Sequence, residues 1–241
     1  MHHTLFISDL HLSADTTEAT DTLLRFLRET AAAADALYVL GDLFEYWIGD
    51  EGLDQPYATQ IAQAFRALAE RGVGVYFMHG NRDFLIGARF AQTSGMQLLP
   101  DPALVDLYGR PTLLMHGDTL CSDDHEYQKF RAMVRDPAWQ QAFLGKPLDE
   151  RVRMAREVRG KSERAKQVKD MAIMDVTPAT VEDTLRAHHY ARLIHGHTHR
   201  PARHQHKVDG RDCERWVLAD WYHHGSCLLC DASGCRAQPL G

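Results

Sequence analysis

The stretch LYVLGD, residues 37–42, runs four apolar residues directly into a glycine and an aspartate. Four other stretches also place a metal-capable side chain just after an apolar run: Asp9-Leu10-His11, Gly80-Asn81-Arg82-Asp83, His116-Gly117-Asp118 and Gly196-His197-Thr198-His199. Ligands collect at strand ends in α/β sheets, because the loops there converge on one crevice. We therefore expect an α/β protein with its site at the ends of several strands.

Around these stretches, short apolar runs alternate with amphipathic helices. The runs at 5–8, 36–40 and 75–78 are typical of buried strands, and helical apolar stripes lie between them. Asp54 is a candidate N-cap, with Pro56 near the first helical position. Strands are expected again at 112–115, 192–195, 216–219 and 226–230, with a helix from Thr177 and Pro178 in between. The alternation predicts a largely parallel sheet with helices packed on it.

The pattern changes between Cys121 and about Asp170, where no strand signal occurs. We expect a single domain over 1–241 with a helical insertion at 122–170. Residues 146–169 hold nine Lys/Arg against four Asp/Glu. One interpretation is a solvated basic helix face, and the other is a lid that faces anionic groups or an anionic membrane surface.

Composition excludes several classes of protein. The 241 residues carry 27 Lys+Arg against 33 Asp+Glu, a net charge of −6, and 44% are hydrophobic, as in ordinary soluble globular proteins. No apolar run approaches the ~20 residues that cross a bilayer. The N-terminus lacks the pattern of a signal peptide, so we expect a cytoplasmic protein. The acidic net charge makes nucleic acid an unexpected partner.

Five cysteines, an odd count, occur in a chain too large to need disulfides for its stability. We expect them to be reduced. Cys227 and Cys230 have partial zinc-site spacing, but a second such pair is missing, so a structural role is favoured.

The clusters together supply two carboxylates, one amide oxygen and four imidazoles: Asp9, His11, Asp42, Asn81, His116, His197 and His199. This set is too large for one ion and suits two, with Asp42 shared. Nitrogen and oxygen donors without thiolate favour Mn(II), with Fe(II) or Zn(II) as alternatives. Two such ions can hold a bridging hydroxide and stabilise a phosphoryl transfer. The set therefore predicts hydrolysis of a phosphoester or phosphoanhydride.

The motif order DxH, GD, GNxD, H, GHxH resembles the calcineurin-like metallophosphoesterase family. The resemblance implies an α/β fold, a β-sandwich of two sheets flanked by helices. By analogy, one ion would be held by Asp9, His11, Asp42 and His199, and the other by Asp42, Asn81, His116 and His197.

Longer stretches, at 41–50, 80–85, 114–121, 173–176 and 220–222, resemble the UDP-2,3-diacylglucosamine pyrophosphatases of lipid A synthesis. That resemblance implies water attack at the α-phosphate, giving UMP and 2,3-diacylglucosamine 1-phosphate (lipid X), usually with Mn(II). Such a substrate comes from a bilayer, so we expect reversible peripheral contact with the cytoplasmic face of the inner membrane. A monomer is favoured. Thr177 and Ala219 depart from the usual residues of that family, and neither is a ligand position.

Arg82 occupies the place where most calcineurin-like enzymes have a histidine. Arginine stays charged and cannot act as a general acid. A leaving phosphate needs no proton, whereas a sugar alkoxide does. Arg82 therefore suits a pyrophosphate bond and would neutralise charge in the transition state. We predict catalytic roles for Arg82, Asn81 and His116.

Substrate contacts are expected from the insertion and from the ligand loops. Ser162, Lys166 and Lys169 share a helical face, at i, i+4 and i+7, that could bind phosphates. The resemblance adds Asp124, and we include Asn81, Arg82 and His197. Six apolar side chains either line an acyl-chain cavity or pack the insertion itself: Phe130, Trp139, Phe143, Leu148, Val152 and Met154. His79 and His195 flank the motifs and are candidates for orienting a ligand.

Two rival hypotheses remain. A two-metal enzyme could act on a water-soluble nucleotide, and then acyl chains on the substrate would not increase turnover. A non-catalytic scaffold could retain the fold, and then Asp42→Ala would leave function intact.

Overall fold

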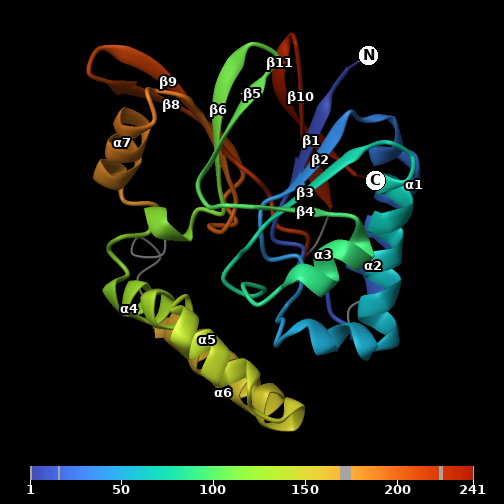
Figure 1. Cartoon of the computed structure of the whole chain (residues 1–241). Coiled ribbons are helices and arrows are strands. Elements are labelled where there is room, and N and C mark those ends of the chain that lie inside the picture. The colour runs from blue at the N-terminus through green and yellow to red at the C-terminus, as the bar shows by residue number, and fades with distance from the viewer. Residues whose placement is uncertain (1, 16, 169–174, 223–224, 241) are drawn as a thin grey trace.

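The computed structural model describes residues 2–15, 17–168, 175–222 and 225–240, and for 161–168 it describes the backbone. Two sheets and seven α-helices make up this part of the chain (Figure 1). One sheet has the strand order β11-β10-β1-β2-β3-β4 and the other β5-β6-β7-β9-β8. The strands are β1 (Thr4–Ile7), β2 (Ala36–Val39), β3 (Gly74–Met78), β4 (Gln97–Leu99), β5 (Ala103–Leu107), β6 (Arg110–Met115), β7 (Arg192–His195), β8 (Ala202–Val208), β9 (Arg211–Val217), β10 (Ser226–Asp231) and β11 (Gly234–Pro239). The predicted two-sheet α/β fold is confirmed.

Both sheets are mixed, so the expectation of a largely parallel sheet is only half right. Strands β1 to β4 run parallel, and so do β6, β7 and β9. The antiparallel strands β5, β8, β10 and β11 belong to hairpins. Two hairpin turns, Tyr108-Gly109 and Asp209-Gly210, have positive φ at both residues, the geometry that matches the twist of paired strands.

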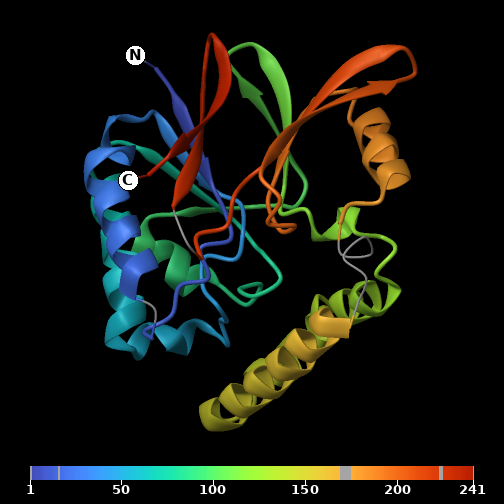
Figure 2. The same ribbon diagram turned by 180° about the vertical axis from the view of Figure 1, so that it is seen from behind.

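The described part of the chain forms seven α-helices, some of which cover the outer faces of the two sheets. They are α1 (Thr17–Glu29), α2 (Pro56–Ala69), α3 (Ala88–Ser94), α4 (His125–Val134), α5 (Pro137–Leu144), α6 (Leu148–Val168) and α7 (Pro178–Ala187). Helices α1 to α3 lie on the six-stranded sheet and α7 lies on the other (Figures 1 and 2). A second apolar cluster, which includes Phe6, Leu114 and Ile194, joins residues of both sheets. Each fully buried side chain of this size contributes about 1.5–3 kcal/mol.

The start of α2 differs from the prediction. Asp54 ends the short 3₁₀ helix Asp50–Asp54, and its carboxylate pairs with Arg89 at 2.6 Å. Gln55 occupies the N-cap position without a side-chain cap, and Pro56 begins the helix as expected. At α7, Thr177 is the N-cap residue and Pro178 the first helical residue, also as expected.

Helices α4, α5 and α6 extend away from the sheets (Figures 1 and 2). They are joined to the rest by apolar packing, because Phe143 is buried in the main core and Trp139, Leu148 and Val152 pack against it. This packing against the main core differs from the packing within the insertion that the sequence suggested, and it leaves the acyl-chain role a prediction. None of the described helices has the length of apolar sequence that a bilayer crossing requires.

The cysteine prediction is wrong for one pair. Cys230 and Cys235 lie directly opposite each other in the β10–β11 register, with Cα atoms 4.1 Å apart, and form a disulfide. The β10–β11 hairpin brings these two residues together, and the spacing of the cysteines in the sequence did not indicate this pairing. Cys121, Cys213 and Cys227 are buried and are not part of a disulfide.

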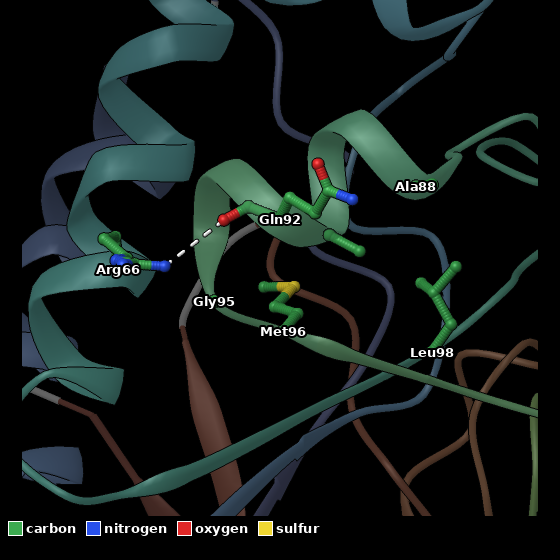
Figure 3. Close-up of a pocket in the computed structure, with 7 residues that line it drawn as sticks. Arg66, Ala88, Gln92, Gly95, Met96 and Leu98 are labelled. Atoms are coloured by element: carbon green, nitrogen blue, oxygen red, sulfur yellow. Dashed lines mark hydrogen bonds between the residues drawn. The ribbon is translucent and has the colours of Figure 1, made fainter.

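A surface hollow of about 600 Å³ lies between α2, α3 and β4. Figure 3 shows Arg66 beside it, donating to the Gln92 carbonyl over 3.3 Å, with Met96 and Leu98 nearby. No predicted site residue lines this hollow.

Candidate metal centre

The seven predicted ligands come from loops that follow strands of both sheets. Asp9 and His11 follow β1, Asp42 follows β2, and Asn81 follows β3. From the other sheet, His116 follows β6, and His197 and His199 follow β7. The carboxyl ends of strands in both sheets therefore meet at one place.

One side of the cluster joins Asp9, His11 and His199. The two histidine Nε2 atoms are 3.3 Å apart, and His199 Nε2 lies 3.4 Å from Asp9 Oδ1. His11 Nε2 also lies 4.0 Å from Asp42 Oδ2. Two imidazole nitrogens that face each other beside carboxylates are typical of a cation site.

The other side of the cluster joins Asn81, His116 and His197. Asn81 Oδ1 lies 2.9 Å from His116 Nε2 and 2.8 Å from His197 Nδ1. His116 Nδ1 donates to the Leu40 carbonyl over 2.9 Å, so Nε2 is the ring nitrogen that faces the cluster. Asp42 Oδ1 is 3.9 Å from that same Nε2, so Asp42 lies between the two sides.

These residues fit divalent metal ions. Donor atoms of Asp9, His11 and His199 lie within 4.8 Å of one another, and so do those of Asp9, Asp42 and His116. Among the described residues, Asp9 Oδ1 is buried without a hydrogen-bond partner. The donors are oxygen and nitrogen, which suits Mn(II), Fe(II) or Zn(II). How the seven ligands divide between two ions stays a prediction.

Five of the seven predicted ligands have left-handed backbone conformations. The φ angles are 55° at Asp9, 49° at His11, 53° at Asp42, 68° at His197 and 54° at His199. Such a conformation costs an L-residue about 1–2 kcal/mol. It persists only where the surrounding structure fixes it, and residues of this kind concentrate at functional sites.

The ligand loops approach one another too closely for side chains at two glycines. A Cβ on Gly80 would lie 2.1 Å from Asp42 Oδ1, and one on Gly196 would lie 2.3 Å from Asp9 Oδ2. Backbone hydrogen bonds also join the loops, from Asp9 N to the Gly41 carbonyl and from His11 N to the Asp42 carbonyl, both over 3.0 Å.

Asp83 is fully buried and binds the loop amides. It accepts from Leu43 N at 2.7 Å, Gly80 N at 2.9 Å and Asp42 N at 3.3 Å. Burial, together with the charge of Asp42, raises the pKa of Asp83 to about 7. Asp83 thus ties the loop after β2 to the loop after β3.

Arg82 lies at the edge of the cluster, held by two acceptors. Its amide donates to Asp42 Oδ1 over 2.8 Å, and its guanidinium donates to Glu45 Oε1 over 2.9 Å. Arg159 of α6 reaches the same oxygen of Glu45 at 3.0 Å. Burial opposes the ionised form of Glu45, but His11 and the two arginines outweigh it and lower the pKa of this carboxyl.

The surroundings of His116 and His197 shift the pKa values of these two histidines in opposite directions. Burial disfavours the charged form of His116, but Asp42 and Asp118 dominate and raise its pKa to about 9. Burial and the neighbouring His116 lower the pKa of His197 to about 3. His197 is therefore neutral at pH 7 in the protein alone, with a nitrogen lone pair available for a ligand bond.

Several residues of the site were missed by sequence reasoning. Glu45, Asp83 and Asp118 are buried carboxylates beside the ligands, and Asp118 accepts from Tyr127 Oη at 2.6 Å. The Tyr222 ring stacks on His11 with centroids 4.9 Å apart, and Asp220 Oδ2 lies 3.6 Å from His199 Nδ1. The missed residues all lie within the sequence stretches quoted above: Glu45, Asp83, Asp118, Asp220 and Tyr222. A carboxylate or an aromatic ring within such a stretch was therefore the signal that could have identified them.

The other predicted site residues are the two candidate orienting histidines and the candidate substrate contacts. His79 Nε2 donates to the Ile86 carbonyl at 2.7 Å, and His195 Nδ1 donates to the Gly196 carbonyl at 2.9 Å. Asp124 is the N-cap of α4 and accepts from Tyr127 N at 3.1 Å. Lys169 and the side chains of Ser162 and Lys166 lie outside the described residues. The substrate contacts assigned to these residues stay predictions.

Comparison with known proteins gives a consistent result. The family model "Calcineurin-like phosphoesterase" matches residues 2–201. A protein of Stenotrophomonas maltophilia is 52% identical over 244 residues, 98% of each chain. One of Photobacterium profundum is 49% identical over 98% of this chain and 96% of its own, and one of Aromatoleum aromaticum is 51% identical over 95% and 94%. All three relatives are named UDP-2,3-diacylglucosamine hydrolase.

Proposed function

This chain belongs to the calcineurin-like phosphoesterase family, and we propose that it hydrolyses the pyrophosphate bond of UDP-2,3-diacylglucosamine in lipid A synthesis. The observation that carries the proposal is the similarity to hydrolases of that name. One of them is 52% identical to this chain over 98% of both chains. Water attacks the α-phosphate, and the products are UMP and 2,3-diacylglucosamine 1-phosphate.

Two divalent ions, with Mn(II) favoured, would be held by Asp9, His11, Asp42, Asn81, His116, His197 and His199. Such a pair supplies activated water and neutralises charge on the phosphoryl group. The grouping of buried oxygen and nitrogen donors supports this assignment.

Arg82 provides a fixed positive charge at the reacting phosphate. Its guanidinium is held by Glu45 at 2.9 Å, and its backbone is held by Asp42. A guanidinium held in one orientation stabilises charge in the transition state without rearranging. Because the leaving group is a phosphate with a second pKa near ~6, no general acid is required, which agrees with arginine at this position.

The insertion would bind the lipid part of the substrate. Trp139 stacks on Phe143, with ring centroids 5.0 Å apart, and lies 6.4 Å from Phe84 near the ligand loops. Met133, Leu144 and Val158 of the insertion are large apolar side chains that remain exposed. Exposed apolar side chains beside a basic helix suit reversible contact with an anionic membrane surface.

Turnover of acylated and deacylated substrates tests the proposal. Chelator-stripped protein is assayed with UDP-2,3-diacylglucosamine in detergent and with UDP-glucosamine, each with and without Mn(II). We expect Mn-dependent release of UMP from the acylated substrate alone. Equal turnover of both substrates would instead indicate an enzyme for water-soluble nucleotides, and no turnover of either would contradict the proposal.

A flotation assay tests the membrane part separately. The protein should float with vesicles that contain anionic lipid and remain behind with neutral vesicles, because the insertion carries an excess of basic residues. Vesicle binding that ignores lipid charge would contradict this part.

A further inference from the structure

Helix α4 directs one stripe of side chains at two of the ligand loops. Tyr127, Arg131 and Arg135 are spaced four residues apart, so they share a helix face. Arg131 Nε donates to Asp118 over 2.7 Å, two residues beyond His116. Arg135, the C-cap residue directly after α4, reaches the loop after β3. One helix of the insertion therefore contacts loops from both sheets.

Arg135 holds the peptide that precedes Asn81. Its guanidinium donates to the Gly80 carbonyl over 2.8 Å. That carbonyl and the Asn81 amide belong to the same planar peptide unit, so fixing one fixes the orientation of the other. The opposite side of the loop is held from within, because Gly80 N donates to Asp83 over 2.9 Å.

Arg135 also contacts the chain beyond Asn81. Its guanidinium lies over the Phe84 ring, 5.3 Å from the ring centroid, a favourable cation–π arrangement. The arginine thus contacts the loop on both sides of Asn81. A lysine could keep the charge but not the planar, stacked donor group.

The position of Asn81 decides the geometry of one side of the cluster. Its Oδ1 lies between His116 Nε2 and His197 Nδ1, at 2.9 and 2.8 Å. Functional groups of this kind must be held within about 0.5 Å. We propose that Arg135 is a positioning residue for Asn81, so that the insertion sets the geometry of the metal centre as well as binding substrate. The inference rests on the proposed function in one respect, that Asn81 binds an ion.

Metal binding without substrate provides the test. Mn(II) is titrated calorimetrically into stripped wild-type protein and into Arg135→Ala, Arg135→Lys, Asn81→Ala and the double variant Arg135→Ala/Asn81→Ala. Arg156→Ala is the matched control, since Arg156 is an exposed arginine of α6. Thermal unfolding of each stripped variant shows whether it is folded.

We expect Arg135→Ala to weaken one of the two Mn(II) binding events about 10- to 100-fold. Arg135→Lys should have a smaller effect, and Arg156→Ala none. The double variant should match Asn81→Ala, because Arg135 acts through that residue. In turnover, Arg135→Ala should lower kcat and leave KM within about threefold.

Two results would overturn the inference in different ways. If Asn81→Ala weakens Mn(II) binding but folded Arg135→Ala and Arg135→Lys bind as wild type does, Arg135 does not position Asn81 and the metal assignment stands. If Asn81→Ala itself binds both ions normally, the metal assignment fails, and the inference fails with it. Losses that multiply in the double variant would also contradict it.

Discussion

Arg82 and Glu45 form an ion pair of 2.9 Å in which the carboxylate side chain is only 6% exposed. The other carboxylate oxygen of Glu45 lies 3.4 Å from His11 Nδ1. One buried carboxylate therefore contacts both the arginine expected to stabilise the transition state and a predicted metal ligand.

Replacing Arg82 tests its role as a fixed charge. Arg82→Gln should lower kcat about 10²- to 10³-fold, because it removes a donor that acts on developing charge. Arg82→Lys should recover only part of this loss, since the ammonium cannot pair with Glu45 in the same planar geometry. Steady-state kinetics measure both variants, with Arg89→Gln, an exposed arginine, as the control. Wild-type kcat in Arg82→Gln would contradict the assignment.

Glu45→Gln should have a smaller effect than Arg82→Gln, and it should lower both kcat and the affinity for Mn(II). It keeps the shape of the side chain and removes the charge that holds Arg82 and faces His11. We expect kcat and Mn(II) affinity each to fall about tenfold, at the low end of the effects of orienting partners. Kinetics and metal titration of the same preparation measure them. A loss of kcat with unchanged metal affinity would restrict the role of Glu45 to Arg82.

Removing the metal should destabilise the protein as well as inactivate it. Ions that bind only the folded state raise its stability by mass action. We expect excess chelator to abolish turnover and lower the Tm, and Asp42→Ala to be inactive with no Tm response to Mn(II). The exposed Asp15→Ala should behave as wild type does. Retained turnover in Asp42→Ala would contradict the assignment of Asp42 as a metal ligand.

Glu214 makes stability depend on pH at a point away from the metal centre. It lies 2.9 Å from Arg110, 3.1 Å from Arg192 and 2.6 Å from Arg203. Burial opposes its charge, but the three arginines outweigh it and lower its pKa below the ordinary 4.5. A lowered folded-state pKa adds stability above the unfolded-state value, and that stability is lost as pH falls through the folded-state pKa.

Glu214→Gln should therefore lower the free energy of unfolding by about 2 kcal/mol at pH 7, because Arg192 is left buried without its partner charge. The two half-exposed arginines contribute less, since solvent screens them. The difference from wild type should shrink below pH 4.5. Urea unfolding at pH 7 and at lower pH measures it, and a difference independent of pH would contradict the electrostatic cause.

The fold could be predicted from the sequence, and so could the convergence of the seven predicted ligands at strand ends, because both depend on local patterns. An apolar run followed by glycine and a metal-capable residue, as at Leu40 to Asp42, indicates a buried strand that ends in a site loop. Strand β8 was missed because five of its seven residues, 203–207, have polar or charged side chains and give no apolar signal.

The partners of the ligands could not be predicted in the same way. In the sequence, Arg135 and Arg151 resemble the other arginines of the insertion. In the structure, Arg135 contacts the Gly80 carbonyl, and Arg151 is 3% exposed and pairs with Glu51. Their roles depend on where the insertion folds back, which is tertiary information. Cys230 and Cys235 were misjudged for the same reason, since only strand register places them opposite each other.

The left-handed backbone at five predicted ligand positions also limits how far the motifs can be moved to another protein. Short peptides with the sequences around Asp9 or His197 would relax to ordinary conformations and direct their side chains apart. The two sheets impose the required φ angles, so the motifs are not portable units. A designer who grafts the seven side chains onto another scaffold must first reproduce these backbone turns, and a sequence match without two such sheets has little value as an indication of metal binding.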